Sequence, residues 1–272
     1  MAGSEAALNE WLAFAGQLAD AALGLLAPAA ALRPEVQVMA DRSFVTALDA
    51  QIELRLRELI HQRYPSHGVL GEEHGASGAA SDVVWVLDPI DGTAPFIAGV
   101  PVFGTLISLA LEGLPVIGVM HLPVTQQRWQ GVAGRATTLN GRPVRTRTCA
   151  TLDQAILTSS NPDFFSTAER AAALDALRGR TAWRIHGGCC MSYGLLAAGR
   201  TDVAIDTRFK VWDYAPFRPI VEGAGGRITD WAGKPLTLAS GEQVLAAGDA
   251  ARHDDARRLI DTALSAPSPS PA

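Results

Sequence analysis

The sequence predicts a mixed α/β fold, and three observations lead to that prediction. A helical pattern of apolar residues in the first part of the chain precedes several apolar runs that have the length of strands. Turn-forming residues separate those runs. From about Leu152 onward, strand-like and helix-like segments alternate. Periodicity alone supports a mixture of α and β structure and does not define the topology.

The first part of the chain contains two predicted helices followed by strands. Residues 4–27 are rich in alanine and predict a helix. Residues 46–63 predict a second helix, with Thr46 as its cap and apolar side chains at helical spacing: Leu48, Ile52, Leu56, Leu59 and Ile60. Strands are predicted at about 83–87, 104–111 and 115–120, and the pair Asn140–Gly141 is a type I′ hairpin signal.

The second part of the chain predicts the alternating pattern. Its elements in order are a strand, helix Thr167–Leu177, a strand, helix 190–199, strand Asp202–Asp206 and helix 214–224. We therefore divide the chain into an N-terminal half, 1–150, and a C-terminal half, 151–265. The tail 266–272 is a low-complexity Ser-Pro segment that we expect to be disordered.

Composition indicates an ordinary soluble enzyme. At 272 residues with 48% hydrophobic content, the chain can bury a substantial core. Its net charge of −5 argues against nucleic acid or an anionic membrane as a partner. Three cysteines provide no disulfide framework and fit a reducing cytoplasm. The N-terminal segment has acidic residues in place of a basic region, so we interpret it as a helix and not as a signal peptide or membrane span.

The most informative motif is the run VVWVLDPIDGTAPF. Its apolar stretch Val83–Leu87 leads directly into Asp88, Asp91, Gly92 and Thr93. Two carboxylates that follow a buried strand are costly unless something neutralises them. Mg²⁺ takes oxygen ligands and is usually held by a few carboxylates together with substrate phosphate. The spacing therefore suggests a metal and phosphate site.

Further acidic residues lie at the ends of predicted elements. Glu72 and Glu73 follow a short apolar run beside Gly71, Asp49 lies near the start of the second helix, and Asp213 is predicted at the N-cap of helix 214–224. Taken singly, Asp49 and Asp213 also fit plain helix-terminal roles, and a Gly-Glu-Glu turn also fits a polar loop. The Asp88–Thr93 string is harder to explain in that way.

The string LDPIDGT, with GEE upstream and WDYAP downstream, resembles the three signature regions of the inositol monophosphatase superfamily of magnesium-dependent phosphatases. The resemblance runs from about Asp41 to Gly248, and stretches such as NPDFF and YGLLAAGRTDVAID are most similar to the histidinol-phosphatase branch. It implies a layered α/β/α/β/α sandwich with the metal site between the halves, and a homodimer.

The same resemblance implies roles for individual residues. The expected ligands of two or three Mg²⁺ ions are Glu72, Asp88, the Ile90 carbonyl, Asp91, Asp213 and, for a weaker third ion, Asp49. Thr93 and Asp49, with Glu72 as a further catalytic acid, would orient and deprotonate the attacking water. The amides of Gly92 and Thr93 would bind the phosphate.

The leaving-group pocket departs from the branch pattern. This chain has Cys189 where relatives read Asp in GGDC, and Asp206 where they have glutamate. We expect Cys189, Asp206 and Arg184 to line the substrate pocket, with histidinol phosphate as the leading substrate. An inositol, sugar or nucleotide phosphate is the alternative, and a noncatalytic phosphate-binding protein is the third. Met39 and Ala47 also replace the family's usual lysine and glutamate, which affects the third metal.

Overall fold

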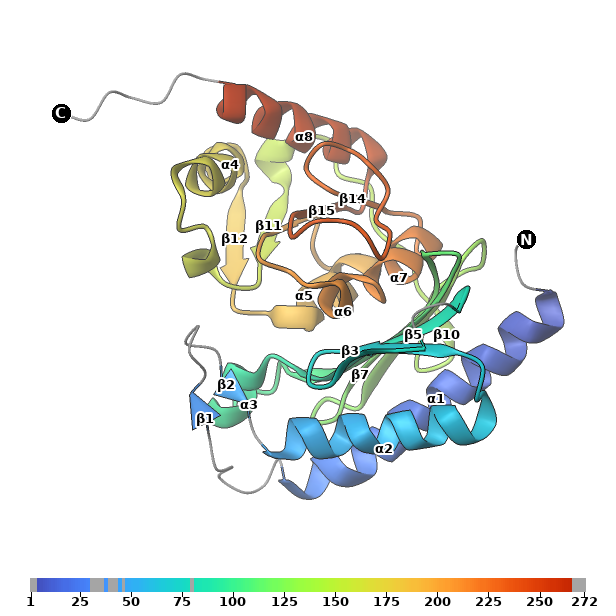
Figure 1. The fold of residues 1–272 in the computed structure, drawn as a ribbon. Helices are drawn as coiled ribbons and strands as arrows, with labels where there is room; N and C mark the ends of the chain where they lie inside the picture. The colour runs from blue at the N-terminus through green and yellow to red at the C-terminus, as the bar shows by residue number, and fades with distance from the viewer. Residues whose placement is uncertain (1–3, 30–36, 39–43, 46, 79–80, 266–272) are drawn as a thin grey trace.

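The structure is a computed structural model that describes residues 4–29, 37–38, 44–45, 47–78 and 81–265. It has the predicted layered α/β/α/β/α arrangement (Figure 1). Helices α1 (Glu5–Ala29) and α2 (Ala47–Arg63) cover the outer face of the first sheet, and α4 (Ala168–Arg178) and α8 (Ala250–Ser265) cover the second. The layer between the sheets consists of α5 (Cys189–Ala197), α6 (Val211–Tyr214) and α7 (Phe217–Gly223).

The first sheet brings two acidic motifs to one edge. It has eight strands in the order β10-β9-β8-β7-β6-β5-β3-β4. Among the strands that the structure describes in this sheet, only β3 and β5 are parallel neighbours, with Gly71 opposite Leu87, so the segments that follow these two strands lie side by side. The strands are β3 (Gly68–Gly71), β4 (Gly75–Ser77), β5 (Val83–Asp91), β6 (Gly104–Leu111), β7 (Leu114–Leu122), β8 (Gln127–Val132), β9 (Thr138–Leu139) and β10 (Arg142–Pro143).

The second sheet has the order β12-β11-β13-β15-β14. Strands β11, β12 and β13 are parallel, so their carboxyl ends, near Ser159, His186 and Asp206, share one edge. Its strands are β11 (Ile156–Ser159), β12 (Trp183–His186), β13 (Val203–Asp206), β14 (Arg227–Thr229) and β15 (Val244–Ala247). The remaining described elements are β1 (Gln37–Val38), β2 (Phe44–Val45), α3 (Thr93–Ala98) and the 3₁₀ turns Leu152–Gln154 and Pro162–Phe164.

The described residues form three apolar cores, one on the outer face of each sheet and one between the two sheets, and each contains one fully buried tryptophan. Trp85 lies in the core between the first helix pair and the first sheet. Trp129 lies in the core between the two sheets, and Trp231 lies beneath α4 and α8. The three clusters alternate with the sheets because both faces of each sheet are covered.

Helix α1 is long and apolar enough, by length and composition, to cross a membrane. One face of it is nevertheless used for packing within this protein. Phe14, Leu18, Ala22 and Leu26 are buried in the same core as α2 and the first sheet. Amphipathic helices that cover a sheet have this pattern.

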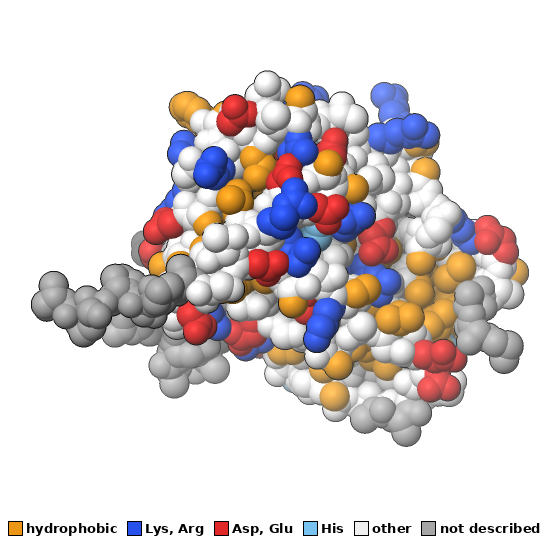
Figure 2. Space-filling model, turned by 90° about the horizontal axis from the view of Figure 1, so that it is seen from above, with side chains coloured by type: hydrophobic (Ala, Val, Ile, Leu, Met, Phe, Trp, Pro, Cys, Tyr) orange, Lys and Arg blue, Asp and Glu red, His pale blue; other side chains and the backbone are white. Residues whose placement is uncertain are grey.

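The outer surface around α8 carries charges of both signs. Figure 2, viewed from above, shows basic and acidic side chains interspersed on this face. Ion pairs account for much of the pattern: Arg227 with Asp254, Arg257 with Asp261, and Arg252 and Arg258 with Asp255. Such a surface differs from the continuous basic stripe of a nucleic-acid binding face.

The structure confirms the predicted hairpin turn and corrects the predicted helix 214–224. Asn140 and Gly141 have φ values of 49° and 75° between paired strands β9 and β10, so the type I′ turn is confirmed. The prediction of one helix over 214–224 is wrong, because the chain forms two short helices, α6 and α7, in this region. They are separated near Pro216, which has no amide hydrogen to donate. Asp213 is therefore inside α6, three residues after its N-cap Lys210, and is not the N-cap. Thr46, Met39 and the tail 266–272 lie outside the described residues.

Glycines allow the middle helix layer to approach the first sheet closely. Gly118 and Gly131 are opposite each other on β7 and β8. A methyl group at Gly118 would lie 2.8 Å from the backbone carbon of Pro216, and one at Gly131 would lie 2.5 Å from the Ile220 nitrogen. The absence of side chains at these positions sets the height of α7, and of the adjoining α6, above the sheet.

Gly118→Ala should therefore destabilise the fold. Because the added methyl group meets rigid backbone, we expect a loss of about 1–3 kcal/mol in the free energy of unfolding, measured by urea denaturation. Gly24→Ala is the matched control, since nothing lies within 4 Å of that position on α1 and the change should stabilise by about 0.5–1 kcal/mol. Equal stability of Gly118→Ala and wild type would show that the two layers are not in contact through this glycine.

Candidate active site

Carboxylates from both halves of the chain converge between the sheets. One oxygen from each of Asp88, Asp91 and Asp213 can be chosen so that all three lie within 4.8 Å of one another. Asp88 is only 1% exposed, and its Oδ1 has no hydrogen-bond partner among the described residues. A buried carboxylate oxygen without a donor is costly. Oxygen donors at this spacing fit a hard divalent cation such as Mg²⁺.

Two more predicted acids lie beside this cluster. Glu72 is in the turn after β3, where its amide donates to the Leu87 carbonyl of β5 at 3.3 Å. Asp49 lies in the first turn of α2 and is 1% exposed. Its charge contributes to the raised pKa values of Glu72, Glu73 and Asp88, which places it near all three. The structure thus brings together the acidic residues that the sequence singled out from four separate segments.

The acids raise one another's pKa values. Desolvation, followed by the charges of Asp213, Glu73 and Asp49, raises the pKa of Glu72 to about 9, although this residue still reaches solvent. Burial and the charge of Asp91 raise the pKa of Asp213 to about 8. Burial also raises the pKa of Asp88 and of Asp91. Without cations, therefore, several of these groups hold protons near neutral pH.

Backbone amides fix the orientation of two of these carboxylates. The amide of Cys190, at the start of α5, donates to Asp91 Oδ2 at 2.7 Å. The amide of Lys210 donates to Asp213 Oδ2 at 2.6 Å. Both bonds lower the pKa of their carboxyl groups and so oppose the effect of burial. Each amide thereby fixes the position of one carboxylate oxygen.

Thr93 is the first residue of α3, which follows Gly92 in a left-handed conformation with φ of 79°. Its hydroxyl donates to the Ile90 carbonyl at 3.1 Å. With its hydrogen used in this way, Thr93 Oγ1 can orient a water by accepting a hydrogen bond but cannot itself remove the proton. The predicted deprotonation is therefore left to a carboxylate.

The predicted substrate pocket is only partly assembled as expected. Cys189 has a positive φ of 43° and lies next to Gly92, since a methyl group on Gly92 would be 3.2 Å from its Sγ. Asp206 is fully buried, and its oxygens accept hydrogen bonds from the Ser160 amide at 2.7 Å and the Tyr193 hydroxyl at 3.0 Å. This arrangement is at odds with direct binding of a substrate ammonium by Asp206. Arg184 is exposed on β12, and its guanidinium donates to the Arg178 carbonyl.

Sequence reasoning missed Glu53, which is 0% exposed on α2. It accepts hydrogen bonds from the amides of Glu73 and His74, directly after the ligand candidate Glu72. A signal was present, because Asp49, Glu53, Leu56 and Ile60 share one helical stripe whose other members are buried. An acid on the core side of a helix needs partners.

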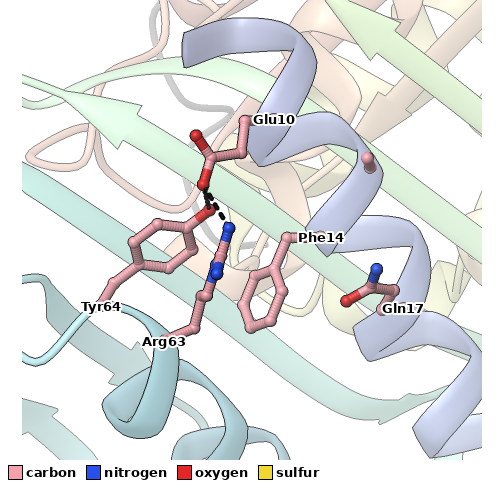
Figure 3. Close-up of a pocket in the computed structure, with 6 residues that line it drawn as sticks. Glu10, Phe14, Gln17, Arg63 and Tyr64 are labelled. Atoms are coloured by element: carbon pink, nitrogen blue, oxygen red, sulfur yellow. Dashed lines mark hydrogen bonds and ion pairs between the residues drawn. The ribbon is translucent and has the colours of Figure 1, made fainter.

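A separate cavity has none of these acids in its lining. A cavity of about 420 Å³ lies between α1 and the end of α2, lined by Glu10, Ala13, Phe14, Gln17, Arg63 and Tyr64 (Figure 3). Arg63 and the Tyr64 hydroxyl both donate to Glu10, at 2.8 and 3.0 Å. Because Arg63, the cation in this lining, is already paired with Glu10, this cavity is a poor phosphate site.

Comparison with known proteins agrees with the geometry of the acidic site. The inositol monophosphatase family profile matches residues 7–264. The bifunctional phosphatase IMPL2 of Arabidopsis thaliana is 38% identical over 267 residues, covering 95% of this chain and 77% of that protein. A histidinol-phosphatase of Mycobacterium tuberculosis is 35% identical over 210 residues, covering 75% of this chain and 80% of its own length.

Solved structures also share the fold. The structure of an inositol monophosphatase from Zymomonas mobilis superposes with a TM-score of 0.85 at 37% identity, covering 93% of this chain and 98% of that one. Both the sequence and the arrangement of layers are therefore shared along nearly the whole chain. This protein belongs to the inositol monophosphatase family.

Proposed function

We propose that this phosphatase hydrolyses a small phosphate monoester by direct, Mg²⁺-dependent transfer of the phosphoryl group to water. The observation that carries the proposal is the convergence of Asp88, Asp91 and Asp213, with Asp88 Oδ1 buried and unpaired. A phosphatase without a cation could not tolerate this arrangement beside a dianionic substrate. The same carboxylates supply the oxygen ligands that Mg²⁺ prefers.

The residues that would hold the ions are Glu72, Asp88, Asp91, Asp213, the Ile90 carbonyl and, more weakly, Asp49. When bound, Mg²⁺ neutralises phosphoryl oxygens and acidifies water. Thr93 Oγ1 would orient the attacking water, since its hydrogen is already donated to Ile90. Asp49 or Glu72 would receive the proton. The amides of Gly92 and Thr93 would bind the phosphate at the start of α3.

Histidinol phosphate is the first substrate that we propose. Support comes from two relatives that are named histidinol-phosphatase. The one from Mycobacterium tuberculosis is 35% identical to this chain, and the one from Chlorobaculum parvum is 33% identical. A specific observation favours a second candidate, the phosphate ester of an uncharged polyol, such as an inositol monophosphate. Cys189 is neutral next to Gly92, and Asp206 already accepts hydrogen bonds with both oxygens. We further propose that the protein acts as a cytoplasmic homodimer, without nucleic acid or membrane.

A phosphate-release screen tests the function. The substrates are histidinol phosphate, inositol monophosphates, fructose bisphosphate and nucleotide 3′-phosphates, each with Mg²⁺ and with a chelator. Activity should disappear in the chelator and return with Mg²⁺. Full activity in chelator, with trace metal excluded by elemental analysis, would refute the assignment, and activity on no substrate would favour the noncatalytic alternative.

The stability of the metal-free protein should decrease as the pH rises from about 5 to about 9. The pKa values of Glu72 and Asp213 in the folded state, about 9 and about 8, exceed the value near 4 of an unfolded carboxyl group. The folded protein therefore binds more protons in this window, and unfolding becomes easier as the pH rises. Thermal unfolding in chelator would show the slope, and Mg²⁺ or Asp88→Asn should reduce it. Stability that increases with pH over this window would contradict the arrangement.

Loss of the Thr93 hydroxyl should impair the chemical step. We expect Thr93→Ala to lower kcat by roughly 10²–10⁴-fold, the usual range for lost acid–base assistance, with a much smaller change in KM. Thr93→Ser keeps the hydroxyl and should retain most of the activity. Unchanged kcat in the alanine variant would assign the orientation of water to another residue.

An acid at position 189 should shift selectivity toward a substrate ammonium. Because Cys189 lies beside Gly92, Cys189→Asp should raise kcat/KM for histidinol phosphate relative to inositol monophosphate by about 5- to 150-fold, equivalent to about 1–3 kcal/mol. Cys189→Asn is the matched control, since it is similar in shape and uncharged. An equal preference in both variants would show that position 189 does not contact the leaving group.

A further inference from the structure

A second buried carboxylate lies just behind the acidic site. Glu53, in the middle of α2, is 0% exposed. Its Oε2 accepts a hydrogen bond from the Glu73 amide at 2.7 Å, and its Oε1 accepts from the His74 amide at 3.1 Å. Arg57, one turn later, donates from Nε to the same Oε1 at 2.7 Å. The donors around both oxygens offset the large cost of burying this charge.

Arg57 extends the contact to the other side of the same turn. Its guanidinium donates to the Gly75 carbonyl and, at 3.1 Å, to Ser77 Oγ. Glu53 and Arg57 together therefore bind the chain at residues 73, 74, 75 and 77. Gly71 makes room for this pair, because a methyl group there would lie 2.7 Å from Glu53 Oε2. The turn between β3 and β4 is anchored to α2 by paired charges on both sides.

The anchored turn carries Glu72. Glu72 lies near Asp213, Glu73 and Asp49, whose negative charges oppose its ionisation, so repulsion favours moving it outward before a cation is present. Its own amide is bound to Leu87, and the next two amides are bound to Glu53. Figure 1 shows α2 beneath β3, with α6 on the opposite side of the first sheet. The anchor thus holds the turn from the face opposite to α6, which carries Asp213.

We propose that Glu53, together with Arg57, is a positioning residue that preorganises Glu72 for binding the divalent cation. The inference rests on the proposed function. Glu53 is not itself a ligand, because both of its oxygens already accept hydrogen bonds. Glu53 restricts the conformations of the turn before the cation binds. Cation binding therefore does not have to order Glu72, and the affinity is higher.

Glu53→Gln tests the role, with Glu58→Gln as a matched control. Glu58 lies on the same helix in an exposed pair with Arg55 and undergoes the same change of charge. In Glu53→Gln, the new amide group cannot accept from both backbone amides. The Mg²⁺ concentration for half-maximal activity should rise about 10- to 100-fold, the range typical for lost partners of metal ligands. KM for the phosphate ester should stay the same, and saturating Mg²⁺ should restore most of kcat.

Two measurements that do not need enzyme activity distinguish the positioning of Glu72 from a general effect of Glu53 on the stability of the fold. Calorimetric titration with Mn²⁺ should show the same loss of affinity, and amide hydrogen exchange of Glu73 and His74 should accelerate in the metal-free variant. A merely structural role would lower the thermal midpoint without changing cation affinity in the folded protein. If Glu53→Gln does not fold, Arg57→Lys keeps the charge but loses the forked contacts, and it should weaken cation binding in the same direction but less.

The outcomes are distinguishable from failure of the proposed function. A folded Glu53→Gln protein with the cation affinity of Glu58→Gln would overturn the positioning role while leaving the phosphatase assignment intact. If wild type hydrolyses no phosphate ester, the proposed function fails, and the Mn²⁺ titrations still decide the role of Glu53. Wild type that binds no divalent cation would overturn both.

Discussion

The mutual repulsion of carboxylates in a partly dehydrated space is the constraint on which the active site depends. Asp88 and Asp91 come from β5, Asp49 from α2 and Asp213 from α6, and burial is the largest cause of the raised pKa of Asp88, Asp91 and Asp213. The fold counters this with backbone amides more than with basic side chains. Cys190 and Lys210 donate their amides to Asp91 and Asp213, so each acid is oriented without a permanent counter-charge that would compete with a cation.

This solution ties the site to the packing of the two halves. Asp91 ends a strand of the first sheet, and the amide that holds it begins a helix packed on the second. Asp213 belongs to a short helix whose successor rests on Gly118 and Gly131. The distance between the carboxylates is therefore set by contacts between layers, and the cation site can form only when both halves are folded together.

The sequence was sufficient for what is local and periodic. Apolar runs predicted the central strands, and the position of Asp88 and Asp91 directly after such a run pointed to the acidic site. The sequence was insufficient where contacts between residues distant in the chain determine the local structure. The break at Pro216 was visible, but whether two short helices or one bent helix would form depended on the sheet beneath. The burial of Asp206 arises from Ser160 and Tyr193, which only the tertiary fold brings to it. Glu53 could have been suspected from its helical stripe, yet its partners lie in a hairpin about twenty residues later.

The placement of one buried tryptophan in each core gives the molecule three built-in optical reporters. Trp85, Trp129 and Trp231 occupy the lower, central and upper apolar layers, respectively. Their emission depends on the exclusion of water from the layer that surrounds each ring. Proteins that retain only one of the three, with phenylalanine at the other tryptophan positions, would report on a single layer. Comparison of their denaturation curves would reveal whether the five layers lose their order in one cooperative step or separate at the central core first.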